Sequence, residues 1–351
     1  MDGHLSKITA TDLTSILTGD PQALDVHLTL VERDVVIEGH AVKVHCHCLT
    51  VDGNGRVQPR RLAEFMRNAV VDYAIPRSKV AEAKARDLKY NSTEATTELV
   101  ERAKRSFTDV AKTGEGGEML LFLLAERFLK LPQILCKMDL KTDNRMHYHG
   151  SDGVYAGVTP SGTLKLYWGE SKIYNKVGTA IRDCLASLAP FLTELESEDA
   201  EREQDLILLS DKADLTNPEL TDALKRYFDR SSPMSARVQY CGVALVGFDP
   251  LFTQPRMRER LPTRSSLAPA KRLLPGVARL DHGLRQKSSA EWKFNSSVFR
   301  CHQRMDSVPL SSKPWGLRAN EPRRTASMAP RGRDSRGPRC DNSHDGSHWN
   351  L

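Results

Sequence analysis

Two short stretches of the chain carry the residue types that hydrolysis of a phosphodiester bond requires. Asp152 stands directly before the apolar run GVYAGV, and Glu170 and Lys172 follow the apolar run LKLYW. Side chains at positions i and i+2 of a strand leave the same face, so Glu170 and Lys172 would point the same way. Two carboxylates can hold a divalent cation that activates water, and a lysine can orient that water or stabilise charge at phosphorus. These three residues are the candidate catalytic set of a metal-dependent nuclease.

The pattern of an acid, any residue and a lysine is weak by itself. The chain contains five such pairs: Glu82/Lys84, Asp87/Lys89, Asp139/Lys141, Glu170/Lys172 and Glu291/Lys293. The first two fall in a polar, helix-like stretch, the third ends a predicted strand that no acidic strand precedes, and the fifth lies in an irregular segment. Only the fourth ends an apolar strand that follows a strand beginning with an acid. Its simpler interpretation is a solvated strand end with a surface ion pair.

The turn TPSG at 159–162 predicts that the two apolar strands form a hairpin. Asp152 and Glu170 would then meet across neighbouring strands around one metal ion. Ser171 points away from that face, but its backbone carbonyl can reach the metal. Glu118, in the first turn of an apolar helix, is a further candidate ligand, and the alternative role for its charge is to complement the helix dipole. Oxygen ligands of this kind favour Mg²⁺, with Mn²⁺ as a substitute.

Two clusters of histidine and cysteine offer competing metal sites. In HYHGSDG, His147 and His149 precede Asp152 and could hold zinc with it, or could be polar neighbours of the carboxylate site. In the run HCHC at 45–48, strand alternation would send the histidines to one face and the cysteines to the other, so the four could not share an ion. We therefore expect packed cysteines and exposed histidines there.

The predicted elements describe a mixed α/β protein. Alternating residues at 24–51 predict two strands, Pro59 opens a helix to about 74, and residues 93–111 predict a polar helix. An apolar helix at about 115–130, strands at about 133–141, 152–158 and 164–171, a helix at about 176–194, a helix at about 217–229 and a strand at 237–247 follow. The order helix–strand–strand–strand–helix–strand indicates a central sheet flanked by helices. We expect an N-terminal α+β region at 1–111, a core at 112–252 and an irregular tail at 253–351.

Charge is divided unevenly along the chain. Residues 251–351 hold 20 Lys and Arg against 8 Asp and Glu, whereas residues 1–250 hold 31 against 37. The basic tail is therefore no evidence for a basic DNA-binding face on the folded part. It is rich in Arg, Ser and Pro, and two explanations stay open: a disordered arm that contacts anionic partners, or translation in a shifted frame.

The apolar runs and the cysteines indicate in which cellular compartment the protein is expected. The longest apolar run, Met119–Ala125, is far shorter than the roughly 20 residues that span a bilayer. The N-terminus carries Asp2 and Asp12 without an apolar core, so it does not look like a signal peptide. Seven cysteines without a CxxC pair indicate free thiols. We expect a cytoplasmic protein that does not enter a membrane.

Several separated motifs, in order, resemble the HamA nuclease subunit of Hachiman antiphage defence systems. The matching segments are VVDYAIPRS, TGEGGEMLLFLL, KMDLKTDN, HGSDGVYAG, YWGESKIY, DALKRYFDRSSP and GVALVGFD. The resemblance covers roughly residues 25–250. It implies a restriction-endonuclease-like fold, DNA as substrate, and a superfamily-2 helicase partner that restrains the nuclease.

Carried over by position, the resemblance gives Glu170 and Lys172 the catalytic Glu-x-Lys role, Asp152 the metal-binding role and Glu118 that of the helical acid. Two departures stand out. Tyr155 occupies a position where we expect histidine, which places it beside the metal ligands rather than among them, and the tail from about 253 does not continue the pattern.

Three functions are consistent with these features. The first is an Mg²⁺-dependent deoxyribonuclease that acts as the effector of a two-protein defence complex. The second is a non-catalytic subunit that uses the same fold to bind DNA or the helicase. The third is a zinc-stabilised adaptor built on the Cys and His residues. The intact set of Asp152, Glu170 and Lys172 favours the enzyme, because a binding module has no need of it.

Overall fold

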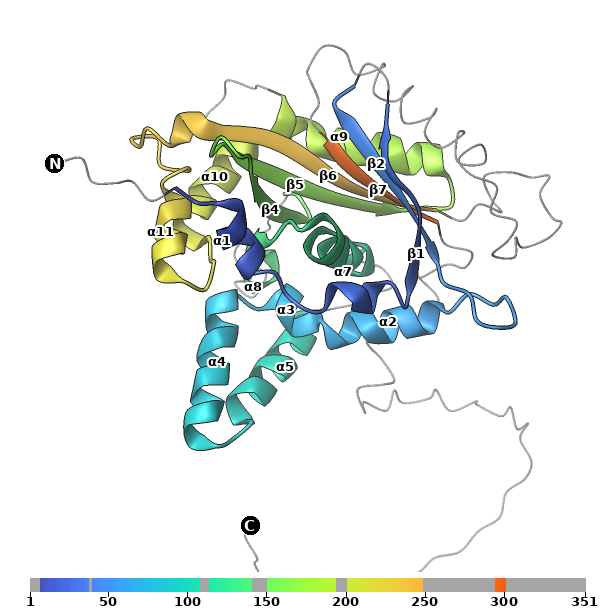
Figure 1. The fold of residues 1–351 in the computed structure, drawn as a ribbon, viewed down its shortest axis with the longest axis horizontal. Helices are drawn as coiled ribbons and strands as arrows, with labels where there is room; N and C mark the ends of the chain where they lie inside the picture. Colours follow the sequence, from blue (N-terminus) through green and yellow to red (C-terminus); the bar gives the residue numbers. More distant parts are fainter. Residues whose placement is uncertain are drawn as a thin grey trace, which may run out of the picture.

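The computed structural model describes residues 7–37, 40–107, 114–140, 150–193 and 201–248, together with the backbone of 294–300. Its strands form a mixed sheet in the order β1-β2-β7-β6-β5-β4-β3 (Figure 1). The strands are β1 Leu28–Val36, β2 Val42–Leu49, β3 Gln133–Leu135, β4 Gly153–Val158, β5 Leu164–Ile173, β6 Val238–Phe248 and β7 Phe294–Arg300. β1 with β2, and β3 with β4 and β4 with β5, pair antiparallel, whereas β2, β7, β6 and β5 pair parallel.

Helices cover both faces of this sheet. On one face α7 Glu115–Leu123 contacts β5 and β6, and α2 Pro59–Asn68 and α3 Val70–Ala74 pack on α7. On the other face α9 Val177–Leu192 contacts β5 and β6, and α10 Glu201–Lys212 packs on α9. Each face has its own apolar core, with Trp168 in the α9 core and Tyr167 in the α7 core. The mixed α/β class predicted from the sequence is confirmed.

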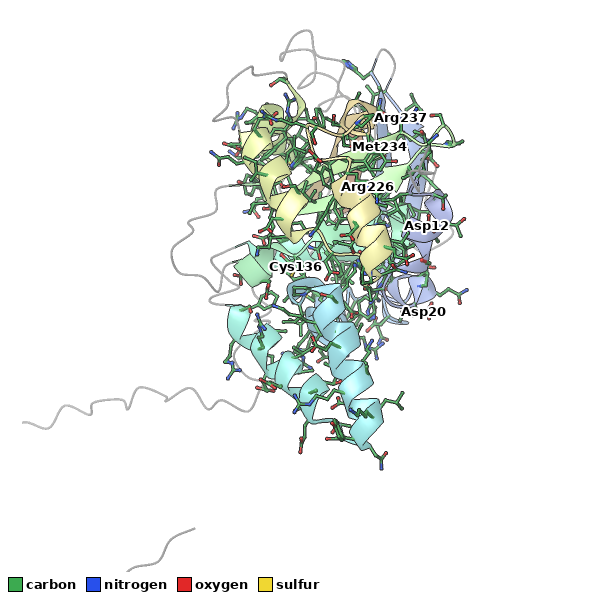
Figure 2. The ribbon with its side chains drawn as sticks, turned by 90° about the vertical axis from the view of Figure 1, so that its left-hand side faces the viewer. Asp12, Asp20, Cys136, Arg226, Met234 and Arg237 are labelled. Carbon is green, nitrogen blue, oxygen red and sulfur yellow. The ribbon has the colours of Figure 1, made fainter. Side chains whose placement is uncertain are left out.

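The structure describes further helical segments. They are α1 Ala10–Ser15, η1 Pro21–Leu24, α4 Arg77–Tyr90, α5 Glu94–Ser106, the π-helix η2 Leu124–Leu129, α8 Lys137–Leu140, α11 Pro218–Lys225 and η3 Ser235–Arg237. α4 and α5 pack on each other as a hairpin that projects away from the sheet (Figures 1 and 2). In the part of the chain described here, no helix is long and apolar enough to cross a membrane.

The elements that matter for the candidate site agree with the sequence prediction. The hairpin between β4 and β5 closes through Thr159, whose N–H donates to the Thr163 carbonyl at 3.0 Å, and Gly162 takes a positive φ of 80° in its turn. The apolar helix begins after Gly114, which also has a positive φ, of 77°. Its π-helical extension ends at Lys130 with a left-handed φ of 59°, before Pro132. The five described cysteines are free thiols, as expected.

Other elements differ from the prediction. The strand expected at 133–141 stops at Leu135, and α8 follows it; Asp139 therefore lies on a helix, where it pairs with Lys79 and Arg102. The sequence predicted no helix over the segment that forms α10, which packs on α9 through Leu209. The helix from Pro59 breaks at Ala69. Nothing in the sequence predicted β7, which contributes a parallel strand between β2 and β6.

The expectation for the histidines of β2 was wrong. Strand alternation holds, since Cys46 packs into the α9 core, but His45 and His47 are each only 3% exposed. Both rings pack edge-on against Phe128 of η2, because β2 is an interior strand covered on that face by the π-helix. Burial lowers the pKa of His47 to about 4.

This burial predicts a specific acid sensitivity. A histidine that stays neutral in the folded state contributes stability that is present above its unfolded pKa of 6.5 and is lost as the pH falls toward 4. Between pH 7 and pH 5 the loss attributable to His47 is about 2 kcal/mol in the free energy of unfolding. Urea unfolding at both pH values should show that His47→Leu loses less stability than wild type. His40→Gln, at a partly exposed histidine, is the control, and equal losses in all three proteins would contradict the prediction.

Candidate active site

The end of β5 presents an acid and a lysine on one face. Trp168, Glu170 and Lys172 alternate with Gly169 and Ser171, and Trp168 stacks on Phe191 of α9 with ring centroids 5.4 Å apart. Glu170 is only 4% exposed, and the Lys172 ammonium donates to its Oε1. The two side chains therefore share the face predicted from their spacing, and they pair with each other there.

Asp152 lies where β4 begins, beside the same stretch of β5. Gly153 pairs with Gly169, and the Asp152 N–H donates to the Gly169 carbonyl at 2.8 Å. The Asp152 carboxylate then accepts from the Ser171 N–H at 2.7 Å and from the Ser171 hydroxyl at 2.6 Å, both through Oδ2. A side-chain carboxylate thus occupies the place that the backbone of β4 would have filled had the strand continued.

The backbone of Ser171 faces this carboxylate. In a strand the N–H and C=O groups of one residue are directed to the same edge. Since the Ser171 N–H donates to Asp152, its carbonyl is also directed to the edge that β4 leaves open. The carbonyl thus has the direction that the prediction of a Ser171 backbone ligand requires.

The two acids interact electrostatically. Burial, followed by the charge of Asp152, raises the pKa of Glu170 to about 7, against the opposing effect of Lys172. Burial likewise raises the pKa of Asp152, while its hydrogen bonds from Ser171 and the charge of Lys172 act in the other direction. Near neutral pH the pair therefore holds less than two full negative charges, unless a cation comes close.

The two lysines near these acids respond in opposite ways. For Lys172, burial works against the charge, but the ion pair with Glu170 and the field of Asp152 outweigh it and raise the pKa. For Lys137 of α8, burial dominates and lowers the pKa, although Asp205, Asp152 and Glu170 all oppose this shift. Both acids thus lie within electrostatic reach of two cationic side chains.

Sequence reasoning missed Lys137 and Asp205. The Lys137 ammonium donates to the Ser151 hydroxyl at 3.1 Å and to Asp205 at 3.3 Å, and Asp205 also accepts from the Trp168 indole N–H at 2.8 Å. This buried network joins α8, the residue before Asp152, α10 and β5. No motif marks it, because its members come from four separate segments that only the fold brings together.

Glu118 approaches from the opposite face of β5. A Cβ added at Gly117 would stand 3.0 Å from the Ser171 hydroxyl, so the first turn of α7 lies directly against the end of the strand. The Glu118 carboxylate accepts from the Tyr73 hydroxyl at 2.9 Å. Glu118 is thus one residue from the contact between α7 and Ser171, and lies on the α7 side of the sheet, away from Glu170.

Tyr155 also belongs to this face. Its ring is fully buried and packs over two glycines of the paired strands. An added Cβ at Gly153 would stand 2.6 Å from the Tyr155 hydroxyl, and one at Gly169 would stand 2.8 Å from its ring. Gly153 and Gly169 thus give the ring the room to lie along the sheet toward Asp152.

The structure also bears on the histidine and cysteine clusters that were candidates for metal sites. Across the segments that the structure describes, no three His, Cys, Asp or Glu side chains are grouped so as to hold a metal ion, and this includes His45 to Cys48. Asp152 and Glu170 therefore form a pair of carboxylates, and Glu118 is not close enough to make this pair a group of three. His147 and His149, and the pair Glu291/Lys293, lie outside the described residues.

Comparison with known proteins places the chain in a family. The family model of HamA matches residues 25–251, which is well over half of the chain and includes every candidate site residue. A search of curated proteins finds no match. The matched region runs from before β1 to just beyond β6, and so contains α7, the β4–β5 hairpin and α9. The chain belongs to the HamA family of Hachiman defence proteins.

Proposed function

We propose that this protein is a metal-dependent deoxyribonuclease with a restriction-endonuclease-like core, and that it acts as the effector of a two-component defence system. The observation that carries the proposal is the meeting of Asp152 and Glu170 at one strand end with Lys172 beside them. A buried acid and a partly buried acid that repel each other are costly in a purely structural role, whereas a nuclease uses both of them.

The donor set fits a hard divalent cation. Asp152 and Glu170 supply carboxylate oxygens, the Ser171 carbonyl faces the same edge, and Glu118 lies nearby. Oxygen ligands that are few in number leave room for several waters, which is the coordination that Mg²⁺ prefers and Mn²⁺ accepts. When bound, the cation would supply an activated water and neutralise charge on the phosphate.

Lys172 would stabilise the reaction itself. Its ammonium is held beside Glu170 at the mouth of the strand pair and is about a quarter exposed. A cation on Glu170 would take over the role of neutralising that carboxylate and release Lys172 toward the phosphate. There its positive charge would stabilise the negative charge that builds up on the phosphoryl oxygens during attack by water.

DNA and a superfamily-2 helicase are the proposed partners. The support for both comes from membership of the HamA family. A helicase gene beside the gene for this chain would strengthen the proposal, and copurification of the two products would test it directly. A non-catalytic subunit that binds DNA or the helicase through the same fold is the alternative that the next experiment distinguishes.

Replacement of Lys172 should stop cleavage. We expect Lys172→Ala to lower cleavage of plasmid and linear DNA with Mg²⁺ by on the order of 100-fold or more, since a charge that stabilises the transition state is lost. The fold should persist, because Glu170, whose pKa is already near 7, can take up a proton when its partner is removed. Circular dichroism and helicase association should therefore match wild type.

Lys165→Ala is the matched control, because Lys165 lies on the same strand but at its other end. It should cleave DNA at the wild-type rate in the presence of the partner helicase. Equal cleavage by wild type and Lys172→Ala would refute the site assignment and leave the non-catalytic subunit as the better explanation.

Glu118 can be tested apart from its structural role. Glutamine keeps an oxygen that can accept from Tyr73 but removes the charge. If Glu118 helps to hold the cation, Glu118→Gln should weaken Mn²⁺ binding by about 10-fold or more with little change in thermal midpoint. Calorimetric titration gives the affinity. Unchanged Mn²⁺ binding together with a loss of about 0.3–1 kcal/mol in stability would assign Glu118 to the helix dipole alone.

A further inference from the structure

One buried hydroxyl beside the candidate site is left without a hydrogen bond. Tyr155 is completely buried, and its hydroxyl finds no hydrogen-bond partner within the segments that the structure describes. A buried hydroxyl without a partner destabilises a fold, and in native proteins such groups commonly bond to an ordered water or serve the active site. Phenylalanine would fill the same space without this penalty, so the hydroxyl calls for a physical explanation.

The position of this hydroxyl points to the carboxylates. It lies against the backbone of Gly153, where an added Cβ would come within 2.6 Å of it, and Gly153 follows Asp152 directly. Burial is the main cause that raises the pKa of Tyr155, and the charges of Glu126, Asp152 and Glu118 add to it in that order. After burial, Glu118 and Asp152 act in the same way on the pKa of Tyr73, whose hydroxyl donates to Glu118 at 2.9 Å. The Tyr155 hydroxyl thus lies against the residue that follows Asp152, the Tyr73 hydroxyl lies on Glu118, and both hydroxyls are within electrostatic reach of the two carboxylates.

These groups are suited to hold a water molecule. Buried waters occupy polar sites with two to four hydrogen-bonding partners. Asp152 receives both hydrogen bonds from Ser171 on Oδ2, so its Oδ1 is directed elsewhere. The Tyr155 hydroxyl can donate, and the Tyr73 oxygen, which donates its own proton to Glu118, can accept.

We propose that a water molecule binds between the Tyr155 hydroxyl and the carboxylates of Asp152 and Glu118, and that this water becomes a ligand of the divalent cation. Tyr155 is then a positioning residue, because it acts through the water and not on the DNA. The inference rests on the proposed function. It also gives Glu118 a way to support the cation through a water instead of by direct contact.

Tyr155→Phe tests the proposal in the full-length protein. The ring keeps its packing over Gly153, Gly169 and Leu121, so the variant should fold as wild type does by circular dichroism. Calorimetric titration with Mn²⁺ should show a dissociation constant raised by about fivefold, the effect of one lost hydrogen bond to a bound water. Tyr167→Phe is the matched control, because Tyr167 pairs directly with Tyr155 across the strands and lies in the same core. It should bind Mn²⁺ as wild type does.

A second measurement, the urea midpoint of unfolding, distinguishes a hydroxyl that binds water from one that has no hydrogen bond. The urea midpoint of metal-free Tyr155→Phe should be equal to or below that of wild type if the hydroxyl holds a water. A raised midpoint with unchanged Mn²⁺ affinity would show that the hydroxyl only destabilises the fold. That result would overturn the inference and leave the nuclease proposal in place. Failure of the wild-type protein to bind Mn²⁺ would overturn both.

Discussion

The candidate site depends on the point at which β4 stops pairing with β5. Had β4 continued with the same register, the backbone of Ser151 would have paired with Ser171. The Asp152 carboxylate takes that place and accepts two hydrogen bonds from Ser171. This brings a second acid beside Glu170 in a partly dry environment, where the two charges repel. The positive charges of Lys137 and Lys172 partly offset that repulsion.

The site draws on both faces of the sheet because it lies at an open edge. Glu170 and Lys172 face α9, whose Cys184 thiol donates to the Glu170 carbonyl at 3.4 Å. Glu118, which belongs to α7, and Tyr155 of β4 lie on the other side. Only at the end of a strand pair can groups from the two layers reach the same small volume, because elsewhere the sheet separates them.

A buried ion pair, distant in sequence from the acids, fixes α7 against the sheet. Glu126, in the π-helical extension of α7, is completely buried; it accepts from the Gln133 N–H at 2.6 Å and pairs with Arg77, which also donates to the carbonyls of Gln133 and Ile16. Such a pair adds little net stability but sets orientation, since breaking it would leave a charge buried without compensation. It connects α1, α4, η2 and β3, and so holds the π-helical extension of α7 against the strand that pairs with β4.

The sequence by itself determined the mixed α/β class, the β4–β5 hairpin and the shared face of Glu170 and Lys172, because strand period and turn chemistry are local properties of the chain. It did not determine the burial of His45 and His47, the helix α10 within an acidic stretch, or the strand β7, since these depend on what covers each element. The network of Lys137, Asp205 and Trp168, and the unsatisfied hydroxyl of Tyr155, were likewise decided by tertiary structure. Their members are far apart in the chain, and only packing of the two helical layers on one sheet edge makes them neighbours.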